Sequence, residues 1–71
     1  MEKDWIKLFT GTDFFKAEIA RQALEEAGIH AVLLNKKDSS YGFGQVELWV
    51  HESNKAFAEE VLNEMEEGNE N

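Results

Sequence analysis

Three segments of the chain carry the hydrophobic patterns of β-strands. Residues 45–51 alternate without a break, so that one side of the segment is uniformly aliphatic. Residues 29–34 form a nearly continuous run of apolar and β-branched side chains, which is typical of a strand covered on at least one face. Residues 4–10 are short, aromatic and apolar. We therefore expect three strands.

Alternation divides the first and third of these strands into two faces. The side chains that point one way are all aliphatic, and they are Ile6, Leu8, Val46, Leu48 and Val50. The opposite side combines large aromatic rings with polar groups, and it takes Trp5, Lys7, Phe9, Glu47, Trp49 and His51. We expect the aliphatic set to face the core and the second set to share the other face of the sheet.

Two further segments have the spacing of helices. The first can be capped by an oxygen of Thr12 or Asp13, and it runs to about residue 27, where Gly28 ends it. Its inner face is made mostly of small residues, which let a helix lie close to a sheet: Ala17, Ala20, Ala23, Leu24 and Ala27.

The second helix is expected to begin after Ser53 or Asn54. It carries an apolar stripe made of Ala58, Val61, Leu62 and Met65. Acids at the negative end of the helix dipole are unfavourable, so we expect the helix to fray beyond residue 65. Residues 68–71 are expected to be a disordered acidic tail after a single domain at 1–67.

The order of elements is β-α-β-β-α, and it favours an α+β fold. The connection between the second and third strands has about ten residues, so these two strands should be antiparallel. Placing the third strand between the other two gives a ferredoxin-like split β-α-β, with sheet order 1-3-2 and both helices on one face. The first strand is then left as an open edge.

Charge and composition narrow the functional classes. The net charge of −8 comes from 15 acidic and 7 basic residues, which argues against a protein that binds nucleic acid through its phosphates. There is no cysteine, so disulfides and thiolate metal sites are excluded. No apolar stretch approaches the roughly 20 residues that span a bilayer. The start of the sequence lacks a basic segment followed by an apolar run, and we expect a cytoplasmic protein with no membrane partner.

Several motifs together resemble a known family. They are the sequence Phe-Lys-Ala-Glu-Ile-Ala at 15–20, the Gly-Ile helix exit at 28–29, the loop Asn-Lys-Lys-Asp-Ser-Ser-Tyr at 35–41 and the Val-x-Leu-x-Val strand after a glycine. Over residues 4–65 the chain resembles the bacterial family of putative prokaryotic signal-transducing proteins, a domain of unknown function, in its Bacteroidetes version. The resemblance implies a ferredoxin-like fold grouped with PII-like regulators, and it brings no activity, ligand or cofactor.

The aromatic sheet face is the first candidate site. An open antiparallel face is normally polar, and an exposed apolar patch usually marks an interface. We expect a regulatory interaction module that forms a homodimer or binds another protein through this face or through the first-strand edge. The alternative is that the aromatic rings only pair across the strands. RNA-binding modules also stack bases on such faces, but the acidic chain lacks a basic stripe.

The loop at 35–44 is the second candidate site. Its residues are Lys36, Lys37, Asp38, Ser39, Ser40, Tyr41 and Phe43. Two ammonium groups, two hydroxyls and backbone N–H groups can receive a phosphate, a nucleotide or a carboxylate, and the resemblance to PII-like proteins implies a loop used in this way. This is the alternative function, a sensor of a small anionic metabolite. The loop can equally be a plain polar connection.

Other chemistry is not expected. His30 and His51 lie on different strands and would need two further ligands to hold a metal ion. The serines Ser39, Ser40 and Ser53 have no sequence context that places a histidine beside them. We therefore expect no enzyme, no catalytic residue, no metal and no cofactor.

Overall fold

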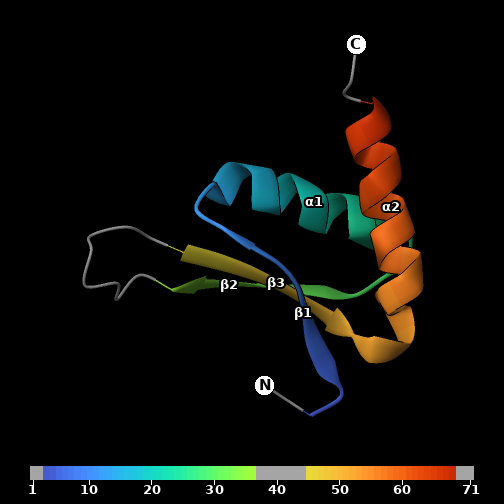
Figure 1. The fold of residues 1–71 in the computed structure, drawn as a ribbon, viewed down its shortest axis with the longest axis horizontal. Coiled ribbons are helices and arrows are strands. Elements are labelled where there is room, and N and C mark those ends of the chain that lie inside the picture. Colours follow the sequence, from blue (N-terminus) through green and yellow to red (C-terminus); the bar gives the residue numbers. More distant parts are fainter. Residues whose placement is uncertain (1–2, 37–44, 69–71) are drawn as a thin grey trace.

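The computed structural model describes residues 3–36 and 45–68, which form a three-stranded sheet with two helices (Figure 1). In chain order the elements are β1 (Trp5–Gly11), α1 (Phe14–Glu26), β2 (Ala31–Lys36), β3 (Gln45–His51), a 3-10 turn at Glu52–Asn54 and α2 (Lys55–Gly68).

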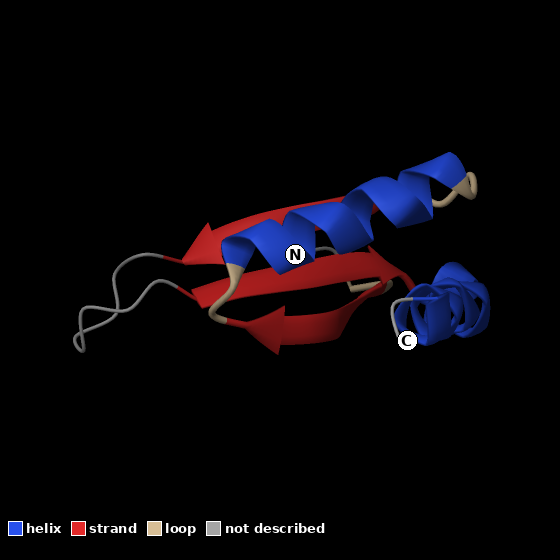
Figure 2. Cartoon of the chain, turned by 90° about the horizontal axis from the view of Figure 1, so that it is seen from above, coloured by secondary structure: helices blue, strands red, loops and turns tan. Residues whose placement is uncertain are grey.

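The sheet has the order β1-β3-β2, and β3 is antiparallel to both neighbours. β1 and β2 are therefore parallel to each other with β3 between them, which is the split β-α-β arrangement. Both helices lie on one side of the sheet, α1 along it and α2 upright at one end (Figures 1 and 2). The predicted α+β fold, strand order and helix placement are confirmed.

Local chemistry explains where α1 begins and ends. The backbone N–H of Lys16 donates to Oδ1 of Asp13 at 3.1 Å, so Asp13 is the N-cap, one of the two candidates that the sequence offered. After the helix, Gly28 has a φ of 87°, a left-handed conformation that disfavours a side chain. This turn directs the N–H of Ile29 back to the carbonyl of Leu24 at 2.9 Å. The chain thereby enters β2 beside the helix it has just left.

The entry into α2 differs in detail from the expectation. A 3-10 turn precedes the helix, and the ring nitrogen Nδ1 of His51 accepts the backbone N–H of Ser53 at 3.1 Å. The helix continues to Gly68, and the fraying expected beyond residue 65 stays a prediction. Its apolar stripe packs on the core as far as Met65, and such packing supplies most of the stability of a helix in a protein. Residues 69–71 of the expected tail lie outside the described residues.

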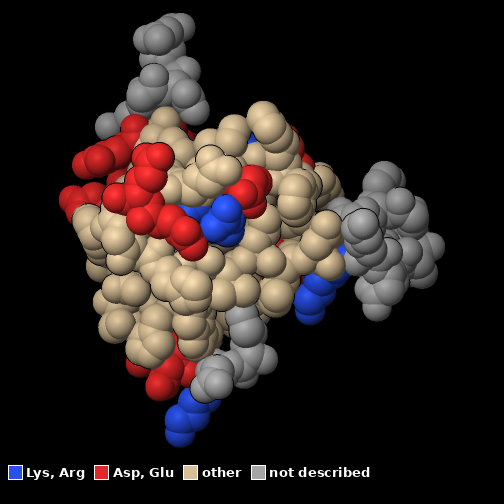
Figure 3. Space-filling model, turned by 180° about the vertical axis from the view of Figure 1, so that it is seen from behind, with Lys and Arg blue, Asp and Glu red and all other residues tan. Residues whose placement is uncertain are grey.

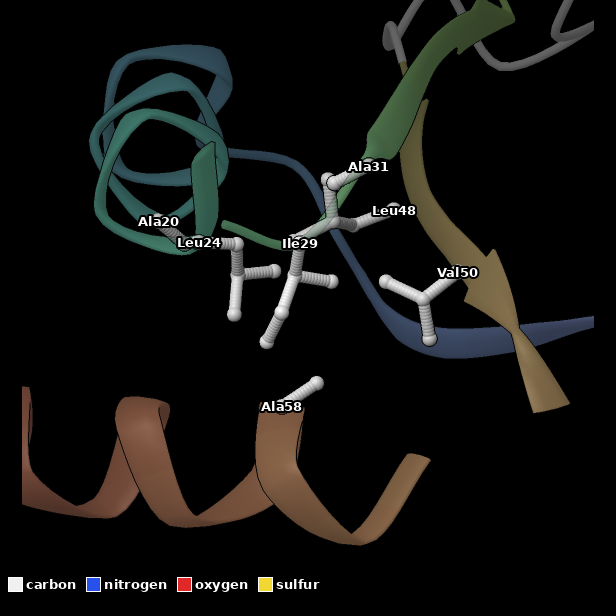
Figure 4. Packing of buried hydrophobic residues seen from close by; sticks show 7 residues of the cluster. All are labelled: Ala20, Leu24, Ile29, Ala31, Leu48, Val50 and Ala58. Atoms are coloured by element: carbon white, nitrogen blue, oxygen red, sulfur yellow. The ribbon is translucent and has the colours of Figure 1, made fainter. Parts of the chain in front are cut away.

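The hydrophobic core lies between the sheet and the two helices. Leu24 of α1, Leu48 of β3 and Ala58 of α2 are completely buried. Figure 4 shows the side chains of Leu24, Ile29 and Val50 directed toward Ala58. Complete burial of each large aliphatic side chain contributes about 1.5–3 kcal/mol to the free energy of folding. Alanines on both helices let the backbones approach the sheet closely.

A bulge in β1 overturns one prediction. Lys7 pairs with Trp49, but Phe9 pairs with Leu48, so one extra residue lies in β1 between them. An extra residue reverses the alternation that follows it. Phe9 therefore lies on the helix-covered side and packs against the core, whereas the sequence pattern placed it on the opposite face. The assignment of Phe9 to the aromatic sheet face was wrong.

Candidate functional site

The strand register brings most of the predicted face residues together. Residues paired directly across antiparallel strands point to the same side of the sheet. In β1 and β3, Trp5 pairs with His51 and Lys7 with Trp49. Glu47 lies on the same side, two residues before Trp49 in β3. Five of the six predicted residues are thus neighbours, and they are Trp5, Lys7, Glu47, Trp49 and His51.

Strand β2 adds residues to this face that the sequence analysis did not assign. Val32 pairs with Trp49 and Leu34 with Glu47. Lys36 follows on the same side, although the sequence analysis placed it in the 35–44 loop. The run at 29–34 is apolar on both sides, so its sequence pattern does not show which side chains face the core. The register of β2 against β3 shows it. We call the surface formed by these residues the open sheet face: Trp5, Lys7, Val32, Leu34, Lys36, Glu47, Trp49 and His51.

Within the described residues, no helix covers the open sheet face (Figure 1). Trp5, Val32, Leu34 and Trp49 are each partly exposed. Their rings and aliphatic groups come from all three strands and form an apolar surface beside the polar groups of the face. The other side of the sheet, in contrast, carries the buried core.

Glu47 lies at the centre of the open sheet face. It is only 8% exposed, although no helix among the described residues covers it. The indole Nε1 of Trp49 donates to its Oε1 at 3.0 Å. The Nζ of Lys7 lies 3.7 Å from Oε2, and the Nζ of Lys36 lies 3.8 Å from Oε1. Each strand therefore contributes a donor or a positive charge to one carboxylate.

These contacts lower the pKa of Glu47. The hydrogen bond from Trp49 is the largest cause, because it stabilises the ionised carboxylate. Partial burial acts in the opposite direction, and the positive charges of Lys36 and Lys7 lower the pKa further. Glu47 is thus an ionised group that orients the indole of Trp49 and holds two lysines on the face.

An aromatic cluster occupies the end of the open sheet face where β1 begins. The ring of Trp5 makes edge-on contacts with His30 at 5.8 Å and with His51 at 6.0 Å between ring centroids. Nε2 of His51 lies 4.0 Å from Oδ2 of Asp4. Among residues 3–36 and 45–68, no three His, Asp or Glu side chains lie close enough to share a metal ion. The histidines here serve as packing partners of Trp5.

The second candidate site falls mostly outside the described residues. This applies to Lys37, Asp38, Ser39, Ser40, Tyr41 and Phe43, so their predicted role stays a prediction. Lys36 is the exception, and its ammonium group approaches Glu47 as described above. In the described part of the chain, no helix is long and apolar enough to cross a membrane.

Comparison with known proteins gives a family match. The family model described as "Putative prokaryotic signal transducing protein" matches residues 5–66. The match begins at the first residue of β1 and includes all but the last two residues of α2. Neither the curated proteins nor the solved structures give a match.

Proposed function

We propose, from the premise that this chain belongs to the family of putative prokaryotic signal transducing proteins, that it is a regulatory module that binds a partner protein on the open sheet face. The proposal keeps the cytoplasmic location that the sequence predicts. It deepens the family description by naming the surface at which a signal would pass to another protein.

One observation carries this proposal. Trp5, Val32, Leu34 and Trp49 remain partly exposed on a sheet face that no described helix covers. An antiparallel sheet with one solvated face normally presents polar side chains there. Contiguous exposed apolar surface marks interaction sites, and tryptophan is enriched among the residues that dominate binding energy.

The sheet face is a better docking surface than the edge of β1. Addition of a strand to an edge needs a regular row of free N–H and C=O groups. The bulge between Lys7 and Phe9 interrupts that row in β1. Bulges protect edges from pairing with other strands, so the bulge supports the face and argues against the edge.

The charges on the face indicate the chemistry of the partner. The two ammonium groups of Lys7 and Lys36 share the single carboxylate of Glu47. One positive charge is therefore in excess at the centre of the face, in a chain whose net charge is −8. Many of the other acids lie over α2 (Figure 3), and Asp4 lies beside His51 at one end of the face. The face is suited to an apolar segment of a partner protein that also carries an acidic side chain.

An affinity experiment tests the proposal. The immobilised chain is incubated with an extract of the cells that make it, and bound proteins are quantified by mass spectrometry. The double variant Trp5→Ala, Trp49→Ala removes both indoles from the face and should lose a partner that the wild type retains. The matched control is Phe57→Ala, which truncates an exposed aromatic ring on α2 and should retain it.

The outcome against the proposal is equally specific. If the double variant remains folded and retains every protein that the wild type binds, the open sheet face is no docking surface.

The alternative function as a metabolite sensor is tested separately, because a ligand that binds the native state raises the melting temperature. Nucleotides at millimolar concentration that raise it would support the alternative.

A further inference from the structure

The junction between β3 and α2 contains a hydrogen bond that depends on the charge of a histidine. Nδ1 of His51 accepts the backbone N–H of Ser53 at 3.1 Å, and Oγ of Ser53 lies 2.9 Å from the same nitrogen. An imidazole nitrogen can accept only while it carries no proton. The neutral ring, with its proton on Nε2, is therefore the form that caps the 3-10 turn before α2. A histidine beside this serine was not expected from the sequence.

The same histidine ring also contacts an acid and an indole. Nε2 of His51 lies 4.0 Å from Oδ2 of Asp4, the residue before β1. The ring meets the indole of Trp5 edge-on, with 6.0 Å between the ring centroids. The backbone N–H of Glu52 donates to the carbonyl of Asp4 at 2.8 Å, which ties the start of β1 to the turn after β3. His51 thus connects Trp5, on the open sheet face, with the turn that precedes α2.

The other titratable groups near Trp5 belong to different contacts. The ring of His30 meets the indole of Trp5 at 5.8 Å, and its Nδ1 lies 4.0 Å from Oε2 of Glu25. His30 caps neither α1 nor the 3-10 turn, so a change of its charge breaks neither of these caps. Lys7, the next residue of β1 on the open sheet face, lies 3.7 Å from Glu47. Of the two histidines at Trp5, it is the one in β3 whose protonation affects the backbone of the turn.

We propose that His51 is a pH-sensitive switch, which holds Trp5 and the turn before α2 in place while it is neutral and releases both when it is protonated. A proton on Nδ1 lies against the N–H of Ser53, so two donors face each other and the ring has to turn. Turning the ring removes its edge-on contact with Trp5. Histidine changes its charge between about pH 5 and 8, so the switch operates in the physiological range.

The consequence for binding rests on the proposed function of the open sheet face. Trp5 is one of the two indoles of that face, and an indole without a fixed position adds an entropic cost to binding. The new positive charge lies beside Asp4, which balances it, so it adds little attraction for an acidic partner. Partner affinity should therefore fall as the pH drops through the titration of His51. Because proton binding and partner binding are linked, we expect a fall of about fivefold or more.

An NMR titration of the full chain from about pH 8 to about pH 5 tests the switch itself. At the start, the imidazole nitrogen shifts should show Nδ1 of His51 without a proton and Nε2 with one. On acidification the amide proton of Ser53 should move upfield, because its hydrogen bond is lost, with the same midpoint as the His51 ring. The indole N–H of Trp5 should move at that midpoint too.

Two variants separate His51 from His30. In His51→Asn an amide oxygen can accept in place of Nδ1 and does not titrate, so the turn should stay capped and neither Ser53 nor Trp5 should move at the former midpoint. The matched control is His30→Asn, which removes the other histidine at Trp5 and should leave both movements in place. In the affinity experiment, acidification should weaken partner binding to the wild type and to His30→Asn, but not to His51→Asn.

Four results would overturn the proposal. A proton on Nδ1 of His51 at the start of the titration excludes the neutral cap. A Ser53 movement that persists in His51→Asn arises from another group. A Trp5 resonance that stays fixed while His51 titrates shows that the switch does not reach the open sheet face. Partner affinity with the same pH dependence in the wild type and in His51→Asn excludes control of binding by this histidine.

The switch and the proposed function fail separately. The NMR titration uses the chain alone, so its outcome does not depend on any partner. The variant Trp5→Ala, Trp49→Ala tests the open sheet face at one pH, so its outcome does not depend on the titration of His51.

Discussion

Glu47 shows how much a single residue can organise on a sheet face. A carboxylate on a central strand without a covering helix would normally be well hydrated, but this one is 8% exposed. Its neighbours on three strands, Trp49, Lys7 and Lys36, surround it. The indole of Trp49 is consequently held in one orientation, which reduces the conformational entropy that a partner's binding would otherwise remove.

The lowered pKa of Glu47 predicts a pH dependence with a definite sign. Because the pKa is lower in the folded than in the unfolded chain, the ionised carboxylate stabilises the fold above the unfolded-state pKa. This contribution is lost as the pH falls through the folded-state pKa. In NMR spectra, the indole N–H resonance of Trp49 should shift with a midpoint below that of an ordinary glutamate.

Substitution of Glu47 tests whether this carboxylate, rather than another acid, causes the pH dependence of the Trp49 resonance. In Glu47→Gln the shift of the Trp49 resonance should disappear, and acidification should lower the melting temperature less than in the wild type. Glu59→Gln, at an exposed position on α2, should retain the shift. A Trp49 midpoint at or above the ordinary glutamate range would contradict the geometry described for this carboxylate.

The strand β1 shows what a bulge does to an element. Before the bulge, Trp5 and Lys7 point to the open sheet face as their alternation predicts; after it, the faces are exchanged and Phe9 joins the core side. The bulge thus has two effects, because it disrupts the strand edge and adds an aromatic side chain to the core side of the sheet.

The position of Phe9 is open to a stability measurement. Phe9→Ala should lower the free energy of unfolding by about 2 kcal/mol, less than the ~3–5 kcal/mol of a fully buried phenylalanine because Phe9 is partly exposed. Phe9→Leu keeps an apolar side chain there and should cost less than about 1 kcal/mol. Chemical denaturation gives both values. If Phe9→Ala changes stability by less than about 0.5 kcal/mol, as surface substitutions do, Phe9 does not pack on the core.

These elements also show what the sequence could and could not predict. The three strands, both helices and a cap at Thr12 or Asp13 follow from local patterns, which act over a few residues, and the strand order follows from the short connection together with the split β-α-β arrangement. The bulge could not be predicted, because the alternation of residues in β1 is the same whether or not one residue is left unpaired with β3. The faces of β2 were equally hidden, since a run that is apolar on both sides acquires its orientation only from pairing with β3.

At the scale of the whole molecule, the two sides of the sheet have different roles. The helix side holds the core. The open sheet face presents Trp5 and Trp49, the only tryptophans of the chain, to a partner. Intrinsic fluorescence therefore reports directly on that face. Binding of a partner there should change it.

Site-specific photo-crosslinking tests the central claim most directly. A photoreactive benzoylphenylalanine at position 34 lies on the open sheet face, and one at position 59 lies on the outside of α2. After irradiation of the cells that make the protein, position 34 should give an adduct with another protein that position 59 does not. Adding Trp49→Ala should abolish the adduct. If position 34 gives no specific adduct, or only an adduct with a second copy of the chain, the open sheet face is not the docking surface for a partner protein.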